Sequence, residues 1–207
     1  MAATDNFKLI IRGSAGHGAM PHQAVDAVVA AAQVIMALQA LVSRQIDPLE
    51  PVVVTVGKIT GGTAINVVAQ EVVLEGTVRT LAPDLRQSMP ERLQTVAEGI
   101  CQAFGAECRL EYNFGYPVLN NDAAMAELAA AAARESGLLP IALAKPLLGG
   151  EDFAYLLEQV PGCMLFLGSG DERFSYPLHH PCFDFDEAIL PIGAKLLARL
   201  AEKALFA

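Results

Sequence analysis

The spacing of apolar positions in the first 60 residues alternates between strand-like and helix-like patterns. Residues 7–14 (FKLIIRGS) and 52–59 (VVVTVGKI) are rich in apolar and β-branched side chains, which predicts two strands. Between them, apolar residues recur at helical spacing, at positions 25, 28, 29, 32, 35, 36, 41 and 42. Two prolines in residues 46–51 (IDPLEP) predict the end of this helix.

Residues 71–116 repeat the order strand, helix, strand. Residues 71–80 (EVVLEGTVRT) and 107–116 (ECRLEYNFGY) predict two more strands. Between them, a helix opened by residues 82–84 carries one apolar stripe, at positions 85, 89, 93, 96, 100 and 104. The order β-α-β-β-α-β predicts a ferredoxin-like α+β domain, in which a four-stranded antiparallel sheet carries both helices on one face.

The pattern changes after residue 116. Asp122 is a suitable N-cap for an alanine-rich helix, and Asp186 for the long amphipathic helix at the C-terminus. Residues 163–170 (CMLFLGSG) form a near-continuous apolar run, which predicts a buried strand of a parallel or mixed sheet. A single strand with three helices is not a complete α/β domain. We therefore expect residues 117–207 to be one part of a sheet domain whose other strands are missing.

Composition and charge exclude some classes of function. The 207 residues are 53% hydrophobic with a net charge of −9 and no run of Lys or Arg, so nucleic acid is not expected as a partner. The longest apolar runs are too short to span a bilayer, so no membrane partner is expected either. The four cysteines form no CxxC pair, and no signal-peptide pattern is evident. Buried, reduced thiols and a cytoplasmic location are the expectation.

The candidate chemistry lies in two histidine clusters within Gly- and Pro-rich loops. GHGAMPH contains His17 and His22, and LHHP contains His179 and His180. Histidine is the usual metal ligand and acid–base residue, although a single histidine beside a proline is often only a turn residue. His17 and His22 are not spaced i, i+4 on a helix and have no Cys or acidic neighbour at ligand spacing. They are therefore not predicted to share a metal.

Five motifs follow one another in one order: GHGAMPH…DAV, GKITGGTAINVV, LEGTVRTL, GGEDFAYLLEQVPG and LHHPCFDFDE. Together they resemble the metal-dependent amidohydrolases of the hippurate hydrolase, aminoacylase and indole-acetyl-amino-acid hydrolase type, relatives of carboxypeptidase G. The resemblance covers essentially the whole chain. It implies that residues 5–116 are the lid, or dimerisation, domain of that family and that residues 117–207 are the C-terminal segment of its catalytic domain.

The resemblance also implies a reaction and a set of residue roles. Two divalent metal ions (Zn, or Mn, Co or Ni) activate a water that hydrolyses the amide of a small N-acyl amino acid. His179 corresponds to a metal ligand. His17 corresponds to the catalytic lid histidine that reaches the partner subunit's active site and stabilises the tetrahedral intermediate. Asn66, Arg79 and Gly150 correspond to substrate-binding residues.

Each of these roles has a physical basis and an ordinary structural alternative. An amide such as Asn66 donates a hydrogen bond without adding charge, but it also forms turns. A guanidinium such as Arg79 grips a carboxylate, but it can equally be an exposed residue at a strand end. A glycine such as Gly150 lets a ligand approach the backbone closely. His22 is expected to be scaffold, and His180 is assigned no role.

The sequence supplies only part of the site that the resemblance implies. A two-metal centre needs several ligands and a general base, yet only His179 is a credible ligand, and no Glu-Glu dipeptide occurs. The remaining groups would lie upstream of Met1. We therefore expect that the chain does not hold the metal pair stably, is inactive alone, and forms a homodimer through its lid.

Two alternatives remain open at this point. The first is a non-catalytic dimerisation or binding module derived from the same family. The second is an enzyme of another class that uses Cys182, three residues after His179, although no oxyanion loop or orienting partner is evident for it.

Overall fold

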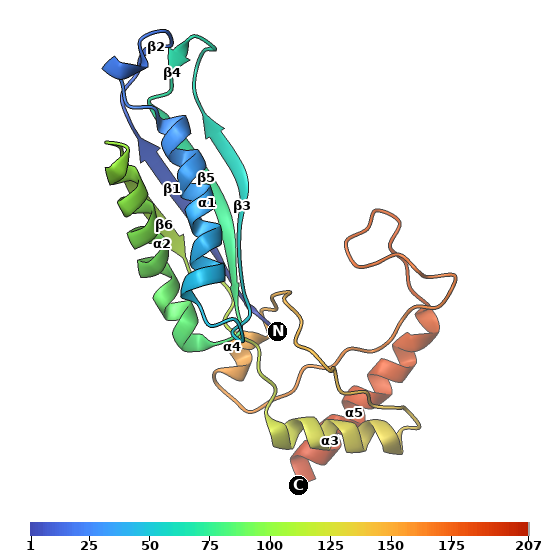
Figure 1. The fold of residues 1–207 in the computed structure, drawn as a ribbon. Coiled ribbons are helices and arrows are strands. Elements are labelled where there is room, and N and C mark those ends of the chain that lie inside the picture. The colour runs from blue at the N-terminus through green and yellow to red at the C-terminus, as the bar shows by residue number, and fades with distance from the viewer. Residues whose placement is uncertain (207) are drawn as a thin grey trace. The chain divides into compact units, whose positions relative to one another are not determined.

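The computed structural model describes residues 1–206, which divide into two compact units. Unit 1 comprises Met1–Leu119 and Pro146–Tyr155, and unit 2 comprises the rest of the chain. Figure 1 shows the ribbon coloured along the chain, with unit 1 running mainly from blue to green. Unit 1 therefore contains the predicted ferredoxin-like domain together with one short segment from later in the sequence.

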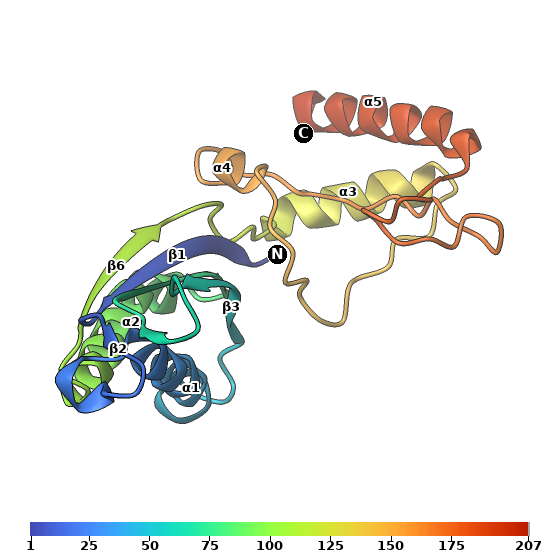
Figure 2. The ribbon, with the colours of Figure 1, turned by 90° about the horizontal axis from the view of Figure 1, so that it is seen from above.

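Unit 1 is built on one antiparallel sheet of four strands in the order β3-β5-β1-β6. Two helices, α1 and α2, cover a single face of it, as the view from above shows (Figure 2). This confirms the predicted β-α-β-β-α-β arrangement, with boundaries moved by a few residues. The elements are β1 (Ala3–Arg12), α1 (Ala27–Gln45), β3 (Val52–Gly61), β5 (Glu71–Thr80), α2 (Pro83–Ala103) and β6 (Glu107–Asn113).

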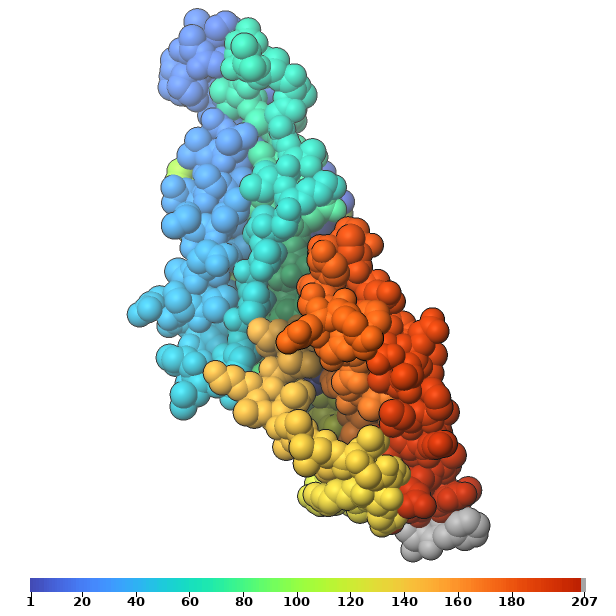
Figure 3. Space-filling view, turned by 90° about the vertical axis from the view of Figure 1, so that its right-hand side faces the viewer, coloured from blue at the N-terminus to red at the C-terminus, as the bar shows by residue number. Residues whose placement is uncertain are grey.

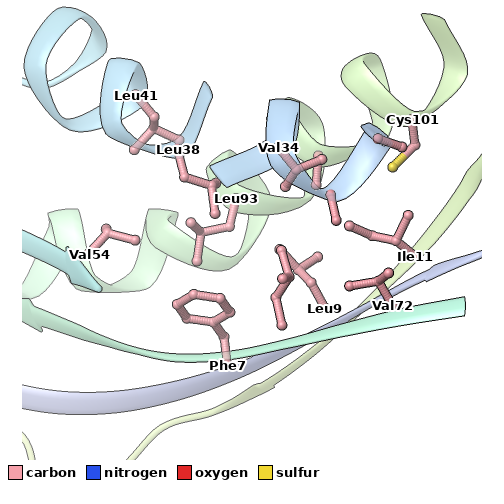
Figure 4. Close-up of a cluster of buried hydrophobic side chains, with 14 of the residues drawn as sticks. Phe7, Leu9, Ile11, Val34, Leu38, Leu41, Val54, Val72, Leu93 and Cys101 are labelled. Carbon is pink, nitrogen blue, oxygen red and sulfur yellow. The ribbon is translucent and has the colours of Figure 1, made fainter. Parts of the chain in front are cut away.

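The core of unit 1 lies between this sheet and the two helices (Figure 4). Along β1, Phe7, Leu9 and Ile11 are buried in alternation with more exposed residues, because successive side chains of a strand point to opposite faces. Helix α1 begins where the Asp26 carboxylate accepts the Val28 N–H at 2.9 Å, which satisfies one of the free amides of the first turn.

The buried positions of both helices differ from the apolar positions whose spacing predicted the helices. On α1 the buried positions are 27, 30, 31, 34, 38 and 41, whereas the apolar Val28 and Met36 are 51% and 67% exposed. Because α1 is apolar nearly all round, its periodicity could not select the face. On α2 the buried row includes Ala97 and Cys101, and Phe104, the last position of the predicted stripe, is 42% exposed.

The other face of the sheet is polar. Its strands carry exposed ion pairs, among them Arg12–Glu71 at 2.9 Å and Lys8–Glu111 at 3.6 Å. Exposed pairs of this kind contribute about 0–1 kcal/mol each. This face therefore needs no covering layer.

A small two-stranded sheet at one end of unit 1 was not predicted. Two-residue strands β2 (Gly16–His17) and β4 (Val67–Val68) pair antiparallel, and the short 3-10 helix η1 (Pro21–Gln23) follows β2. In Figure 1 this two-stranded sheet lies at the opposite end of the four-stranded sheet from the N-terminus. Strands this short carry too little periodicity to be read from sequence.

Unit 2 contains α3 (Ala123–Glu135), η2 (Glu187–Ile189) and α5 (Leu190–Phe206), and the short helix α4 (Ala154–Leu157) straddles the division between the units. The predicted cap of α3 is confirmed, because Asp122 accepts the Met125 N–H at 2.9 Å. Asp186 accepts the Ala188 N–H at 3.0 Å, but it caps η2, the 3-10 turn that leads into α5, and not α5 itself. Helices α3 and α5 pack against each other, as the yellow and red surfaces show (Figure 3).

The predicted strand at residues 163–170 is wrong. This segment has no regular secondary structure, and Leu165 and Phe166 are 43% and 56% exposed. A strand is stabilised by hydrogen bonds to a neighbouring strand. The described part of unit 2, residues 120–145 and 156–206, contains no strand with which this segment could pair. The apolar run therefore stays exposed within unit 2.

Helix α1 is long and apolar enough to cross a membrane by length and composition. However, six of its residues pack in the core of unit 1. A core helix passes the same test, so this finding is weak evidence for a membrane segment.

Candidate functional site

His17 lies on β2 within a loop that is closed at its base. Ser14 and Val25 join the two ends of this loop, since the Val25 N–H donates to the Ser14 hydroxyl at 2.9 Å and the Ser14 N–H donates to the Val25 carbonyl at 3.0 Å. The His17 ring is exposed, and its Nδ1 accepts the Ala19 N–H at 3.1 Å. A nitrogen that accepts a hydrogen bond carries no proton in the neutral ring, so Nε2 is the donor.

Asn66 lies beside His17, in the turn that leads into β4. The Gly18 N–H donates to the Asn66 carbonyl at 2.8 Å, and His17 pairs with Val67 in the two-stranded ladder. Within residues 1–206 the Asn66 side-chain amide makes no hydrogen bond. The structure thus brings together two of the predicted site residues, and we call His17 and Asn66 the tip cluster.

Arg79 and Gly150 form a second group at the other end of the sheet. Arg79 lies directly across from Thr4 in the β1–β5 ladder, and its guanidinium donates to the Val78 carbonyl at 3.1 Å. A Cβ on Gly150 would lie only 2.1 Å from Cγ2 of the same Thr4. Gly150 is therefore required for packing, whatever else it does. We call Arg79 and Gly150 the base cluster.

The two clusters are far apart within unit 1. Arg79 follows Glu71 by eight residues along β5, and a strand rises by about 3.4 Å per residue, which gives a separation of about 27 Å along this strand alone. The two-stranded sheet that contains His17 lies beyond the start of β5 (Figure 1). One small molecule could not contact both clusters of the same chain.

His179 belongs to unit 2 and is exposed. Its φ angle is +67°, and it is the one non-glycine residue with a positive φ in the part of the chain that the structure describes. This left-handed conformation is uncommon for residues with a Cβ and occurs disproportionately at functional sites.

His180 and His22 do not share the positive φ angle of His179. The Nδ1 of His180 accepts the Cys182 N–H at 3.1 Å, and its ring stacks on Tyr176 with centroids 4.3 Å apart. These contacts fit a scaffold role. His22 is exposed in η1, and no hydrogen bond of its ring is found within residues 1–206.

The residues present fit one ligand of a metal centre rather than a whole centre. The exposed imidazole of His179 is a suitable donor to Zn²⁺ or a related ion. Among residues 1–206, no group of three or more His, Cys, Asp or Glu side chains is placed to hold a metal. Within the described residues, His179 is therefore a candidate for a single metal ligand.

Cysteine chemistry finds no support in the geometry. All four cysteines are free, and Cys101 is buried while Cys182 is exposed, so the expectation of buried thiols holds only in part. The His180 ring accepts the backbone N–H of Cys182, and no bond from the thiol to a histidine is found in the part of the chain that the structure describes. An activated Cys–His pair is not formed there.

A buried ion pair in unit 1 was missed in the sequence. Asp5 is fully buried and Arg86 nearly so, and their side chains form hydrogen bonds of 2.8–3.2 Å. Burial, followed by the charge of Asp5, raises the pKa of Tyr112, whose hydroxyl donates to Asp5 at 2.9 Å. The missed signal was the position of Asp5 in phase with the inward-facing Phe7.

Comparison with known proteins adds the family context. Residues 13–203 match the profile of Peptidase family M20/M25/M40. The N-acetyl-L-cysteine deacetylase of Bacillus subtilis is 41% identical over 206 residues, and the match covers 99% of this chain and 48% of that protein. The N-acetyldiaminopimelate deacetylase of Streptococcus sanguinis is 40% identical, with 97% and 53% covered.

A solved structure supports the same assignment. The YXEP protein of Bacillus subtilis, described as a dinuclear metal binding peptidase from the M20 family, aligns with a TM-score of 0.79 at 32% identity. The alignment covers 97% of this chain and 49% of that one. The chain therefore spans about half the length of the curated relatives and of the solved structure that it matches.

Proposed function

Because the chain belongs to Peptidase family M20/M25/M40, we propose that it is the C-terminal part of a metal-dependent amidohydrolase that cleaves the amide of small N-acyl amino acids. Its relatives with named substrates are deacetylases of N-acetylcysteine and N-acetyldiaminopimelate, and hippurate-like compounds have the same linkage. The observation that carries the proposal is the tip cluster, in which two uncharged hydrogen-bond donors are held side by side on a lid domain.

The residues of the chain take distinct roles in this reaction. When bound, a pair of divalent ions (Zn, or Mn, Co or Ni) would supply an activated water, and His179 would hold one of them. The Nε2–H of His17 donates to the oxyanion that develops on the scissile carbonyl. Asn66 donates to the substrate, and Arg79 binds its carboxylate. Gly150 keeps the backbone accessible beside Arg79.

The distance between the two clusters supports a homodimer. Both clusters can act on one substrate only if His17 and Asn66 of one copy reach the site that contains Arg79 and Gly150 of another. The apolar Val28 and Met36 are exposed on α1, and an exposed apolar surface on a lid domain is suited to contact with a second copy. The dimer is therefore part of the proposed mechanism.

The chain alone is proposed to be inactive. Its one credible metal ligand, His179, is too few for a two-metal centre, and the general base would also have to come from outside this chain, which covers 48% of the Bacillus subtilis N-acetyl-L-cysteine deacetylase. The same observation favours a second candidate function, a non-catalytic dimerisation module. A cytoplasmic location and the absence of nucleic-acid or membrane partners stay predictions.

Hydrolysis of hippurate and N-acetylcysteine separates the two candidates. The chain would be assayed alone with Zn²⁺, Mn²⁺, Co²⁺ or Ni²⁺, and again fused behind the N-terminal half of the Bacillus subtilis N-acetyl-L-cysteine deacetylase. We expect no turnover alone and metal-dependent turnover in the fusion, which His17→Ala and His179→Ala abolish and His22→Ala retains. A folded, metal-loaded fusion without turnover would favour the non-catalytic module. Turnover by the chain alone would contradict its proposed inactivity.

Mixing two inactive fusions tests the shared site. A His17→Ala dimer and an Arg79→Ala dimer each lack one cluster in every site. Subunit exchange creates mixed dimers in which one site has both clusters intact, so activity should return to about a quarter of the wild-type value in an even mixture. Failure to regain activity despite demonstrated exchange would contradict the proposal that His17 acts across the dimer.

A further inference from the structure

Gly18 lies between the two residues of the tip cluster, where its backbone packs closely against that of Asn66. A Cβ built on it would lie 2.9 Å from the Asn66 carbonyl oxygen and 3.0 Å from the carbonyl carbon, both much closer than van der Waals contact. The backbone of Gly18 does not have the positive φ that favours glycine. The glycine is therefore required by the space between two backbone segments and not by its own conformation.

Gly18 also connects the two side chains of the cluster. It follows His17 in the chain, and its N–H holds the Asn66 carbonyl at 2.8 Å. The next residue, Ala19, donates its N–H to the Nδ1 of His17 at 3.1 Å. A shift of the backbone at position 18 would thus change both the distance to Asn66 and the hydrogen bond that fixes the imidazole.

We propose that Gly18 is a positioning residue that sets the spacing of the His17 imidazole and the Asn66 amide, and that the amide of Ala19 keeps His17 as the Nε2–H donor. Two donors that act on one substrate must be held at a fixed distance, because displacements of about 1 Å are enough to reduce catalysis strongly. The inference rests on the proposed function for the role of the two donors. The placement itself is measurable without activity.

Nitrogen NMR of the 207-residue chain with labelled histidines tests this placement. The spectra are recorded at about pH 8.5, two units above the ordinary histidine pKa of about 6.5. His17 and His180 each accept a backbone N–H at Nδ1 and should lack the Nδ1–H form, whereas His22 and His179 should show it as a minor species. A His17 spectrum that matches His22 would overturn the proposal.

Gly18→Ala is the decisive variant, and Gly57→Ala is its control. Gly57 lies on β3 of the same unit with no atom within 4 Å of its hypothetical Cβ. In Gly18→Ala we expect the minor Nδ1–H form of His17 to appear and the Asn66 amide signals to shift, with His180 unchanged. Gly57→Ala should leave all of these signals in place. Wild-type signals for His17 and Asn66 in Gly18→Ala would overturn the proposal.

Two further measurements test the role of Gly18 independently of the NMR spectra of the variant. If Gly18→Ala does not fold, exchange of the Gly18 amide in the wild type decides the matter, because it should be slower than in a free peptide of residues 14–25. An unprotected amide would overturn the proposal. In the active fusion, Gly18→Ala should lower kcat at least tenfold with little change in KM. If no fusion is active, the proposed function fails, while the NMR result still decides the role of Gly18.

Discussion

Asp5 is a charged side chain in the interior of unit 1, and its replacement by alanine should destabilise that unit severely. The carboxylate accepts hydrogen bonds from the Arg86 guanidinium at 2.8–3.2 Å, from the Tyr112 hydroxyl at 2.9 Å and from the Gly115 N–H at 3.0 Å. It therefore joins β1, α2, β6 and the segment that follows β6. Asp5→Ala leaves three donors without this acceptor.

The magnitude follows from the charge that is left behind. In Asp5→Ala the guanidinium of Arg86 keeps only the Gly115 carbonyl, at 2.7 Å, and the ring of Phe114, 5.2 Å from its Cζ. Removing one partner of a buried pair costs about 3–5 kcal/mol, a large part of the stability of an ordinary domain. For a unit of roughly 130 residues this lowers Tm by about 10–20 °C.

Urea and thermal unfolding of unit 1 would measure this effect. An exposed pair provides the control: Glu71→Ala removes the partner of Arg12, at 2.9 Å, and should change stability by less than about 1 kcal/mol. The double variant Asp5→Val with Arg86→Met removes both charges and should be more stable than Asp5→Ala, because no unpaired charge remains. If Asp5→Ala costs no more than Glu71→Ala, or if the double variant is worse than Asp5→Ala, the reasoning is refuted.

Three further predictions concern local features of the two units. Asp26→Ala removes the N-cap of α1 and should lower the unfolding free energy by about 1 kcal/mol in urea titrations, whereas an unchanged midpoint would contradict the capping role. Gly150→Ala places a Cβ against Thr4 and should cost about 1–3 kcal/mol, while Gly99→Ala, which meets nothing on the surface of α2, should stabilise by about 0.5–1 kcal/mol; equal Tm values would contradict the packing role of Gly150. A hydrogen bond from Lys203, followed by the charges of Lys203 and Arg199, holds the pKa of Glu135 below its usual 4.5, so its contribution is present above pH 4.5 and is lost as the pH falls through the lowered value. The protection of the α3 amides, taken as the exchange rate relative to the intrinsic rate at the same pH, should therefore fall in acid, and the same fall in Glu135→Gln would show that Glu135 is not responsible.

Local sequence determined most of the elements of this protein. The apolar and β-branched runs at residues 7–14 and 52–59 and the helical spacing from residue 25 predicted a ferredoxin-like unit, which is confirmed. Asp122 was identified as the cap of α3, because a cap depends only on the three or four residues that follow it. The family could also be identified from the ordered motifs, since residues 13–203 match its profile.

Which face of an element is buried was decided only by tertiary structure. Helix α1 is apolar nearly all round, so the packed sheet selects Val34 and Leu38 and leaves Met36 exposed. The run at residues 163–170 has the composition of a strand, but without a neighbouring strand in unit 2 it has no partner for its backbone hydrogen bonds.

For the candidate site, too, sequence identified the residues and tertiary structure decided which of them lie together. Sequence identified His17, Asn66, Arg79, Gly150 and His179 as separate residues of a family pattern, but it could not group them. The fold groups them, because β5 alone separates Arg79 from Glu71 by about 27 Å, and the two-stranded sheet with His17 lies beyond the Glu71 end. Residue type and local order are properties of neighbours along the chain, whereas distance across a sheet and burial of Asp5 against Arg86 depend on segments that only folding brings together.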